Sequence, residues 1–183
     1  NVQVEIVDFE ATQVAVMVPY EIAGQATTQV TLTYGSSNSN SVDMNVAATA
    51  PALFTVAGGT GQAAACNVDP NTGVWSINAD TAGIVKGGTL VLFATGQGQT
   101  TPASTNGQIP VSVSPAPYDP AISVTIGGTA AAVTYAGYSP GMVAGILEIQ
   151  VSVPTTISSS KASPVVLTIG AASSQAGVTV SVK

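Results

Sequence analysis

The chain has 183 residues, of which 45% are hydrophobic and only 7% are charged, against roughly 25% charged residues in ordinary globular domains. It contains no His and no Arg, and nine carboxylates outweigh Lys86, Lys161 and Lys183 to give a net charge of −6. This balance argues against binding to nucleic acid or to an anionic membrane surface, because both depend on several Lys or Arg side chains.

Alternation of apolar and polar residues, the pattern of a half-buried strand, runs through almost the whole chain. In chain order it predicts strands at 2–7, 13–18, 28–34, 42–46, 89–95, 122–126, 131–137, 146–153, 165–170 and 178–182. Clusters of Gly, Pro, Asn and Ser separate these strands, and no segment carries a helical apolar repeat. Short strands at this spacing predict an all-β fold of the sandwich type.

Residues 12–46 and 147–182 repeat one another. Each copy begins with a strand that ends in Val-Pro, at Pro19 and at Pro154. TLTYGSSNS in the first copy then aligns with VLTIGAASS in the second, and VDMNV aligns with VTVSV. Residues 50–183 have enough strands for both sheets of a sandwich, whereas residues 1–49 have about half. We therefore predict a partial domain at 1–49, completed by a neighbouring subunit, and a complete domain at 50–183.

Several motifs follow one another along the chain, including ATQVAVMVPYEIAG, VAATAPALFT, GTGQAAACN, LVLFATGQGQTTP and SSQAGVTVSV. With these motifs, the segment from Ala11 to Lys183 resembles the Solibacter-type uncharacterised C-terminal domain family of exported, mainly acidobacterial proteins. The order of the Pro, Gly and strand motifs is also similar to the TIG-type immunoglobulin-like domain. The resemblance implies tandem immunoglobulin-like sandwiches in a secreted bacterial protein, and it transfers no activity and no catalytic residue.

The chain departs from this family at its start. Family members place a longer segment with Gly-rich strands before the Val-Pro-Tyr motif, which here follows a short segment that begins NVQVEIVDFE. We therefore interpret the chain as trimmed, or its first sandwich as completed from elsewhere. No signal peptide is recognisable at Asn1, which agrees with a processed protein or a fragment. No apolar run reaches the roughly 18 residues of a membrane-spanning helix, and the near absence of Cys and charge predicts an extracellular or cell-surface location.

The sequence offers little ligand-binding chemistry. Asp69, Asn71 and Gly73 have the spacing of a calcium loop, but the distal Glu is missing and a β-turn explains these residues equally well. No predicted helix follows the Gly-Gln-Gly motif at 96–98, so we expect a glycine corner at a strand end and not a nucleotide loop. The prediction is that the chain has no metal site and no cofactor.

The acidic residues do not form a recognisable catalytic pair. Glycoside hydrolysis needs two carboxyl groups that flank one bond, whereas Asp8 and Glu10 lie near the start of the chain and Glu21 and Asp119 lie beside Pro-containing corners. Cys66 has small apolar neighbours, so we expect a buried thiol and not a reactive one. We predict no catalytic residues and a protein that is not an enzyme.

The aromatic residues allow a second kind of function. Phe54 and Phe93 lie in strand patterns that point them inward, whereas Trp75, Tyr118 and Tyr138 lie near loops. If those three side chains form an exposed patch, they would suit binding to surface glycans. The alternative interpretation is ordinary packing at the ends of the sandwich.

The N-terminal segment favours self-assembly. In NVQVEIVDF, alternation places Val2, Val4 and Ile6 on one face, and with Phe9 they form our predicted polymerisation strand. Such a strand can add to an exposed sheet edge, and a head-to-tail contact of this kind propagates into a filament. The alternative is that residues 2–9 are simply the first strand of their own domain.

Three hypotheses follow from the sequence. The leading one is a non-enzymatic subunit of a surface filament that binds copies of itself. The second is an adhesin or a carbohydrate-binding module of a larger exported protein. The third, an enzyme, has the least support, because the acids do not cluster along the chain.

Overall fold

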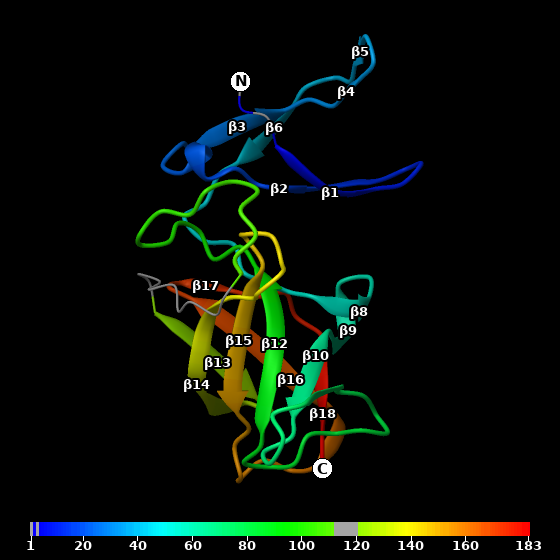
Figure 1. Cartoon of the computed structure of the whole chain (residues 1–183), viewed down its shortest axis with the longest axis vertical. Coiled ribbons are helices and arrows are strands. Elements are labelled where there is room, and N and C mark those ends of the chain that lie inside the picture. Colours follow the sequence, from blue (N-terminus) through cyan, green and yellow to red (C-terminus); the bar gives the residue numbers. More distant parts are fainter. Residues whose placement is uncertain (1, 3, 112–120) are drawn as a thin grey trace.

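The computed structural model describes Val2, residues 4–111 and residues 121–183, and it consists largely of β-strands and turns (Figure 1). The predicted all-β class is confirmed, since the one helical turn among the described residues is the 3-10 helix η1 (Tyr20–Ile22). No helix in this part of the chain is long and apolar enough to cross a membrane.

In residues 50–111 and 121–183 the structure describes one curled sheet of 12 strands, which we call the sandwich. Its strands are β7 (Ala52–Leu53), β8 (Thr55–Ala57), β9 (Thr60–Ala63), β10 (Ala65–Val68), β11 (Trp75–Ile77), β12 (Thr89–Thr95), β13 (Ile122–Ile126), β14 (Thr129–Tyr138), β15 (Leu147–Ser152), β16 (Ser160–Ile169), β17 (Ala172–Ser173) and β18 (Val178–Val182). Along the sheet the order is β11-β10-β12-β15-β14-β13-β16-β18-β9-β8, with β7 paired to β12 and β17 paired to β16. β18 and β9 pair in parallel.

The core lies between two layers of this curled sheet. In Figure 1, β12 and β15 lie in front of β16 and β18. Alternation along each strand sends every second side chain inward, so Leu92 and Ile149 from one layer meet Leu167 and Val180 from the other in one buried cluster. The sandwich expected from the strand pattern therefore has a closed apolar core. Its assignment to the immunoglobulin-like type stays a prediction.

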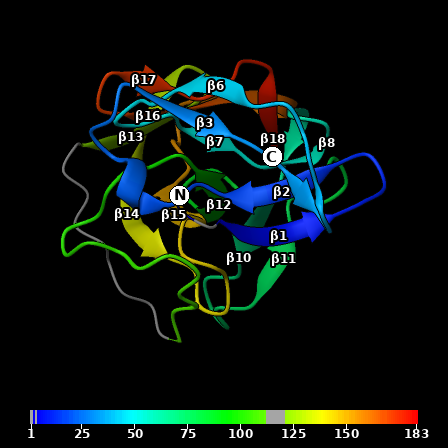
Figure 2. The same cartoon turned by 90° about the horizontal axis from the view of Figure 1, so that it is seen from above.

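The described part of residues 1–49, which we call the N-terminal unit, forms three separate two-stranded sheets. The pairs are β1 (Glu5–Phe9) with β2 (Val14–Met17), β3 (Thr27–Val30) with β6 (Val42–Asn45), and β4 (Thr33–Tyr34) with β5 (Ser37–Asn38). No strand pairing links this unit to the sandwich among the described residues. Figure 2, seen along the long axis, shows the unit stacked over one end of the sandwich.

The hydrogen-bond register confirms the internal repeat. Thr28 pairs with Met44 in the β3–β6 ladder, and Ser163 pairs with Val180 at the same place in the β16–β18 ladder. The turns agree as well, because Ser39 N donates to Leu32 O at 2.8 Å and Ser174 N donates to Leu167 O at 2.8 Å. Gly35 and Gly170 occupy the corresponding turn position with φ of 59° and 61°, a left-handed conformation that favours glycine.

The repeat also includes a strand that the sequence did not reveal. Ile6 of β1 pairs with Val16 of β2, with a bulge before Asp8. Val133 of β14 pairs with Val151 of β15, with a bulge before Tyr135. The N-terminal unit therefore contains counterparts of β14 to β18. Among its described residues it contains no counterpart of β12 or β13.

The absence of a β13 counterpart explains one difference between the copies. β16 is a continuous strand of 10 residues, and β13 pairs with its residues 165–169. The corresponding residues 30–34 have no such partner in the described chain, and the strand is interrupted there between β3 and β4. The single strand predicted at 28–34 is therefore wrong in its continuity, because a strand needs a neighbour to hold its backbone hydrogen bonds.

The prediction for Phe54 is also wrong, since its side chain is exposed. Leu53 takes the inward position in the β7 segment, so alternation turns the next side chain outward. Phe93 is half-buried, and its ring lies 6.3 Å from that of Trp75.

Candidate functional site

The most unusual feature of the molecule is an uncovered apolar surface on the N-terminal unit, which we call the open face. It is defined by eight residues: Val14, Val16, Val18, Val30, Leu32, Tyr34, Val42 and Met44. Their exposed fractions range from 36% to 88%. Their counterparts in the second copy are Ile149, Val151, Val153, Val165, Leu167, Ile169, Val178 and Val180, all of which belong to the sandwich core and are at most 2% exposed. The same repeat positions are thus core in one copy and surface in the other.

Missing neighbours explain this exposure. β15 lies between β12 and β14 in the sheet, and the inward side chains of β12 cover the core positions of the opposite layer. Its counterpart β2 pairs with β1 alone in the described chain, so its second edge is unpaired. The open face therefore combines bare apolar side chains with free backbone donors and acceptors, which is the arrangement that accepts an added strand.

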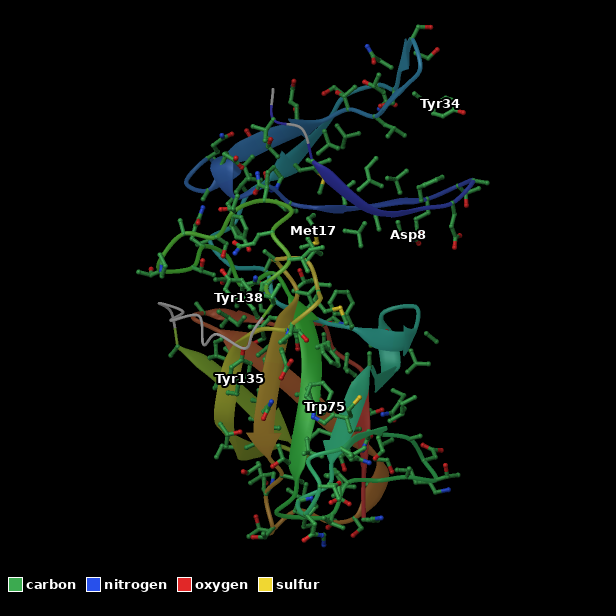
Figure 3. All side chains as sticks on the ribbon, viewed as in Figure 1. Asp8, Met17, Tyr34, Trp75, Tyr135 and Tyr138 are labelled. Carbon is green, nitrogen blue, oxygen red and sulfur yellow. The ribbon has the colours of Figure 1, made fainter. Side chains whose placement is uncertain are left out.

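Charge around the open face has a single sign. Residues 1–49 contain five carboxylates and no Lys. One of them, Asp8, lies on the outlying β1–β2 hairpin in Figure 3. Three lysines and the other four carboxylates all lie in residues 50–183. A surface that covers the open face therefore approaches the carboxylates of the β1–β2 hairpin, Asp8 and Glu10, which we call the acidic rim.

The structure places the predicted polymerisation strand within the N-terminal unit. Val2 and Val4 precede β1, while Ile6 and Phe9 lie in β1 and pair with β2 of the same chain. All four side chains are exposed. The strand therefore forms part of its own domain, as the alternative interpretation has it. Its apolar side chains, and the backbone edge of β1 that faces away from β2, remain uncovered in the described chain.

A polar junction fastens the N-terminal unit to the sandwich. Tyr20 N donates to Asn106 Oδ1 at 2.9 Å, Gln99 Nε2 donates to Tyr20 O at 2.7 Å, and Asn106 Nδ2 donates to Glu21 Oε2 at 2.6 Å. These residues line a cleft of about 440 Å³ together with Ser104. The hydrogen bond from Asn106 lowers the pKa of the Glu21 carboxyl, while burial raises the pKa of the Tyr20 phenol. The cleft is thus lined by groups that already bind one another.

The segment that connects the N-terminal unit to the sandwich packs closely against two glycines that follow β12. Ala50 N donates to Gly96 O at 2.8 Å. A Cβ on Gly96 would lie 1.8 Å from Ala50 O, and one on Gly98 would lie 2.1 Å from Ala48 O. Both glycines also have φ near 80°. The Gly-Gln-Gly motif is therefore a corner that allows close backbone approach, as predicted, and it lies at the junction.

The predicted aromatic patch does not form between the two of its residues that the structure describes. In Figure 3, Tyr138 lies near the junction, whereas Trp75 lies further down, about halfway along the sandwich. The Tyr138 hydroxyl forms a hydrogen bond with Ser104. Tyr118 lies outside the described residues. Trp75 remains an exposed edge residue beside Phe93.

Two other sequence features have structural roles. Asp69 Oδ1 accepts hydrogen bonds from Asn71 N at 2.8 Å and Thr72 N at 2.9 Å, which closes a turn and lowers the pKa of Asp69. Cys66 is half-buried in β10, and burial raises the pKa of its thiol. Among the described residues, no group of three His, Cys, Asp or Glu side chains is placed to hold a metal ion.

Comparison with known proteins gives no relative: no family model, curated protein or solved structure matches the chain. The resemblance to the Solibacter-type family therefore rests on the sequence motifs. Comparison of the two repeat copies within the chain is what identifies the open face.

Proposed function

We propose that this protein is a non-enzymatic structural subunit of an extracellular or cell-surface filament. Copies would assemble head-to-tail, each one completing the half-domain of the next by covering its open face. The single observation that carries the proposal is the contrast between the two repeats, in which eight core positions of the sandwich are exposed in the N-terminal unit.

Burial of the open face would contribute a large favourable free energy. Full burial of a Val, Leu or Met side chain stabilises by about 1.5–3 kcal/mol. The eight open-face side chains are roughly half exposed, so covering them is worth about 10 kcal/mol. That is comparable with the entire stability of a typical domain, about 5–15 kcal/mol. A partner that covers the face would thus bind with a large favourable free energy.

A second copy of the chain carries the charge that a partner of the open face needs. The rim of the open face is acidic, and the chain carries its three lysines elsewhere, in residues 50–183. A contact between unlike ends of two identical molecules is heterologous and leaves one free end of each kind. Such a contact produces a fibre when the rotation between successive copies does not close them into a ring, and the proposal is the open, fibre-forming arrangement.

The proposal is tested by sedimentation velocity and negative-stain electron microscopy of the full chain. Wild-type protein should form fibres whose length grows with concentration. Val16→Asp places a carboxylate on the open face and should leave the protein monomeric, with the thermal unfolding of the sandwich unchanged. Val56→Asp is the matched control, because Val56 is an exposed valine on β8 of the sandwich, and this variant should still form fibres.

Two results would overturn the proposal. One is wild-type protein that stays a monomer up to its solubility limit. The other is a Val16→Asp variant that forms the same fibres as wild type.

A further inference from the structure

The three lysines of the chain lie together at the end of the sandwich that is far from the N-terminal unit. Lys183 N donates to Ile84 O at 2.9 Å, which brings the last residue beside the segment that carries Lys86. The start of β16, with Lys161, pairs with the end of β18. In Figure 1 this end of β18 and the N-terminal unit lie at opposite ends of the long axis.

An exposed apolar side chain accompanies these lysines. Val85, which directly precedes Lys86 in the chain, is 48% exposed. We call the surface formed by Val85, Lys86, Lys161 and Lys183 the tail surface. Its lysine side chains are all exposed.

A buried polar network holds β18, the strand that precedes Lys183, in place. Asn78 is fully buried; its Nδ2 donates to Ser181 O at 2.9 Å and to Asn67 Oδ1 at 2.8 Å. Ser181 N donates back to Asn78 Oδ1 at 2.8 Å. The end of β18 that leads to the tail surface is therefore fixed by satisfied hydrogen bonds.

The charges of the tail surface and of the open face are complementary. Three lysines outnumber the two described carboxylates at this end of the sandwich. Asp80 shares a shallow depression with Lys161 and Lys183, and Asp69 follows Val68, which pairs with Thr89 at the start of β12. The N-terminal unit at the opposite end carries the acidic rim and no lysine. Opposite potentials steer association and select the orientation of a contact, even where each exposed ion pair is weak.

We propose that the tail surface of one copy receives the N-terminal unit of the next copy, with the acidic rim of the open face against the three lysines. This inference rests on the proposed function and specifies the surface that it needs. A head-to-head contact would instead place the acidic rims of two copies against each other, with no lysine in either N-terminal unit, and like charges in a contact oppose it.

Charge reversal at each end tests the contact. The tail-reversed variant carries Lys86→Glu, Lys161→Glu and Lys183→Glu, and the head-reversed variant carries Asp8→Lys and Glu10→Lys. At low salt, each variant alone should need a roughly tenfold or higher concentration to assemble than wild type. An equimolar mixture of the two variants should assemble again, because each reversed end then meets an end of opposite charge. Circular dichroism checks that both variants are folded.

The outcomes separate the two proposals. If wild type assembles and the tail-reversed variant assembles equally well, the tail surface is not the receiving surface, while the proposed function stands. If each variant fails alone and the mixture also fails, the complementary contact is likewise overturned. If wild type itself never assembles, the proposed function falls and this inference falls with it.

Discussion

Truncating the same leucine in each copy of the repeat measures directly whether the open face is bare. Leu32 and Leu167 occupy one repeat position, and both accept a turn hydrogen bond from a serine N–H. Leu167 is fully buried, whereas Leu32 is 50% exposed. The Leu167→Ala variant should therefore lose about 2–5 kcal/mol of unfolding free energy, as buried leucines do. In dilute monomer, Leu32→Ala should lose less than about 1 kcal/mol.

Assembly should reverse this order of sensitivity. In a polymer that covers the open face, Leu32 becomes a core residue, so its truncation should weaken association by about 2 kcal/mol, or roughly 30-fold in the dissociation constant. Urea denaturation of dilute protein, followed by circular dichroism, gives the unfolding free energies. Sedimentation across a concentration series gives the association constants.

Either of two results would refute this reasoning. If Leu32→Ala destabilises the dilute monomer as much as Leu167→Ala does, the open face is covered within the chain. If Leu32→Ala associates with the same constant as wild type, the assembly contact lies elsewhere on the molecule.

The remaining predictions concern the junction and the thiol. Gly96→Ala should lose about 2–4 kcal/mol in urea denaturation, since the new Cβ meets Ala50 O and the backbone is left-handed. The pKa of Glu21 is lowered from 4.5 by the Asn106 hydrogen bond, so the contact is present above pH 4.5 and is lost as pH falls through the depressed value. NMR of the Asn106 side-chain amide should follow this loss in wild type and show no titration in Glu21→Gln. Burial raises the pKa of Cys66, so its reaction with iodoacetamide should be slower than that of free cysteine in mildly alkaline buffer.

The sequence predicted the fold class and the repeat because both depend on alternation, which a single chain displays. It also predicted that residues 1–49 hold only part of a sandwich, from the unequal number of strands around the two Val-Pro motifs. The extension of the repeat to β1 and β14 was not predictable, because EIVDF and the start of β14 share no residue pattern. Their equivalence lies in the pairing register and in a bulge at the same place.

Other features depend on contacts that a sequence does not display. The strands between 52 and 77 were not predicted as a set, since β9 (TGQA) and β10 (ACNV) mix small and polar residues and lack an apolar alternation. The junction joins Tyr20 to Asn106 and Gln99 across about half the chain, so no local signal exists for it. The tail surface likewise collects three lysines that are scattered along the sequence.

The most direct test of the central claim compares the oxidation of two methionines by hydrogen peroxide as the protein is concentrated. Met44 on the open face is 51% exposed and Met142 on the sandwich is 41% exposed, so both should react at similar rates in dilute monomer. Peptide mass spectrometry at rising concentration should show Met44 becoming protected while Met142 continues to react. Equal oxidation of both residues at every concentration, or a Met44 already protected in dilute monomer, would contradict a face that another copy covers.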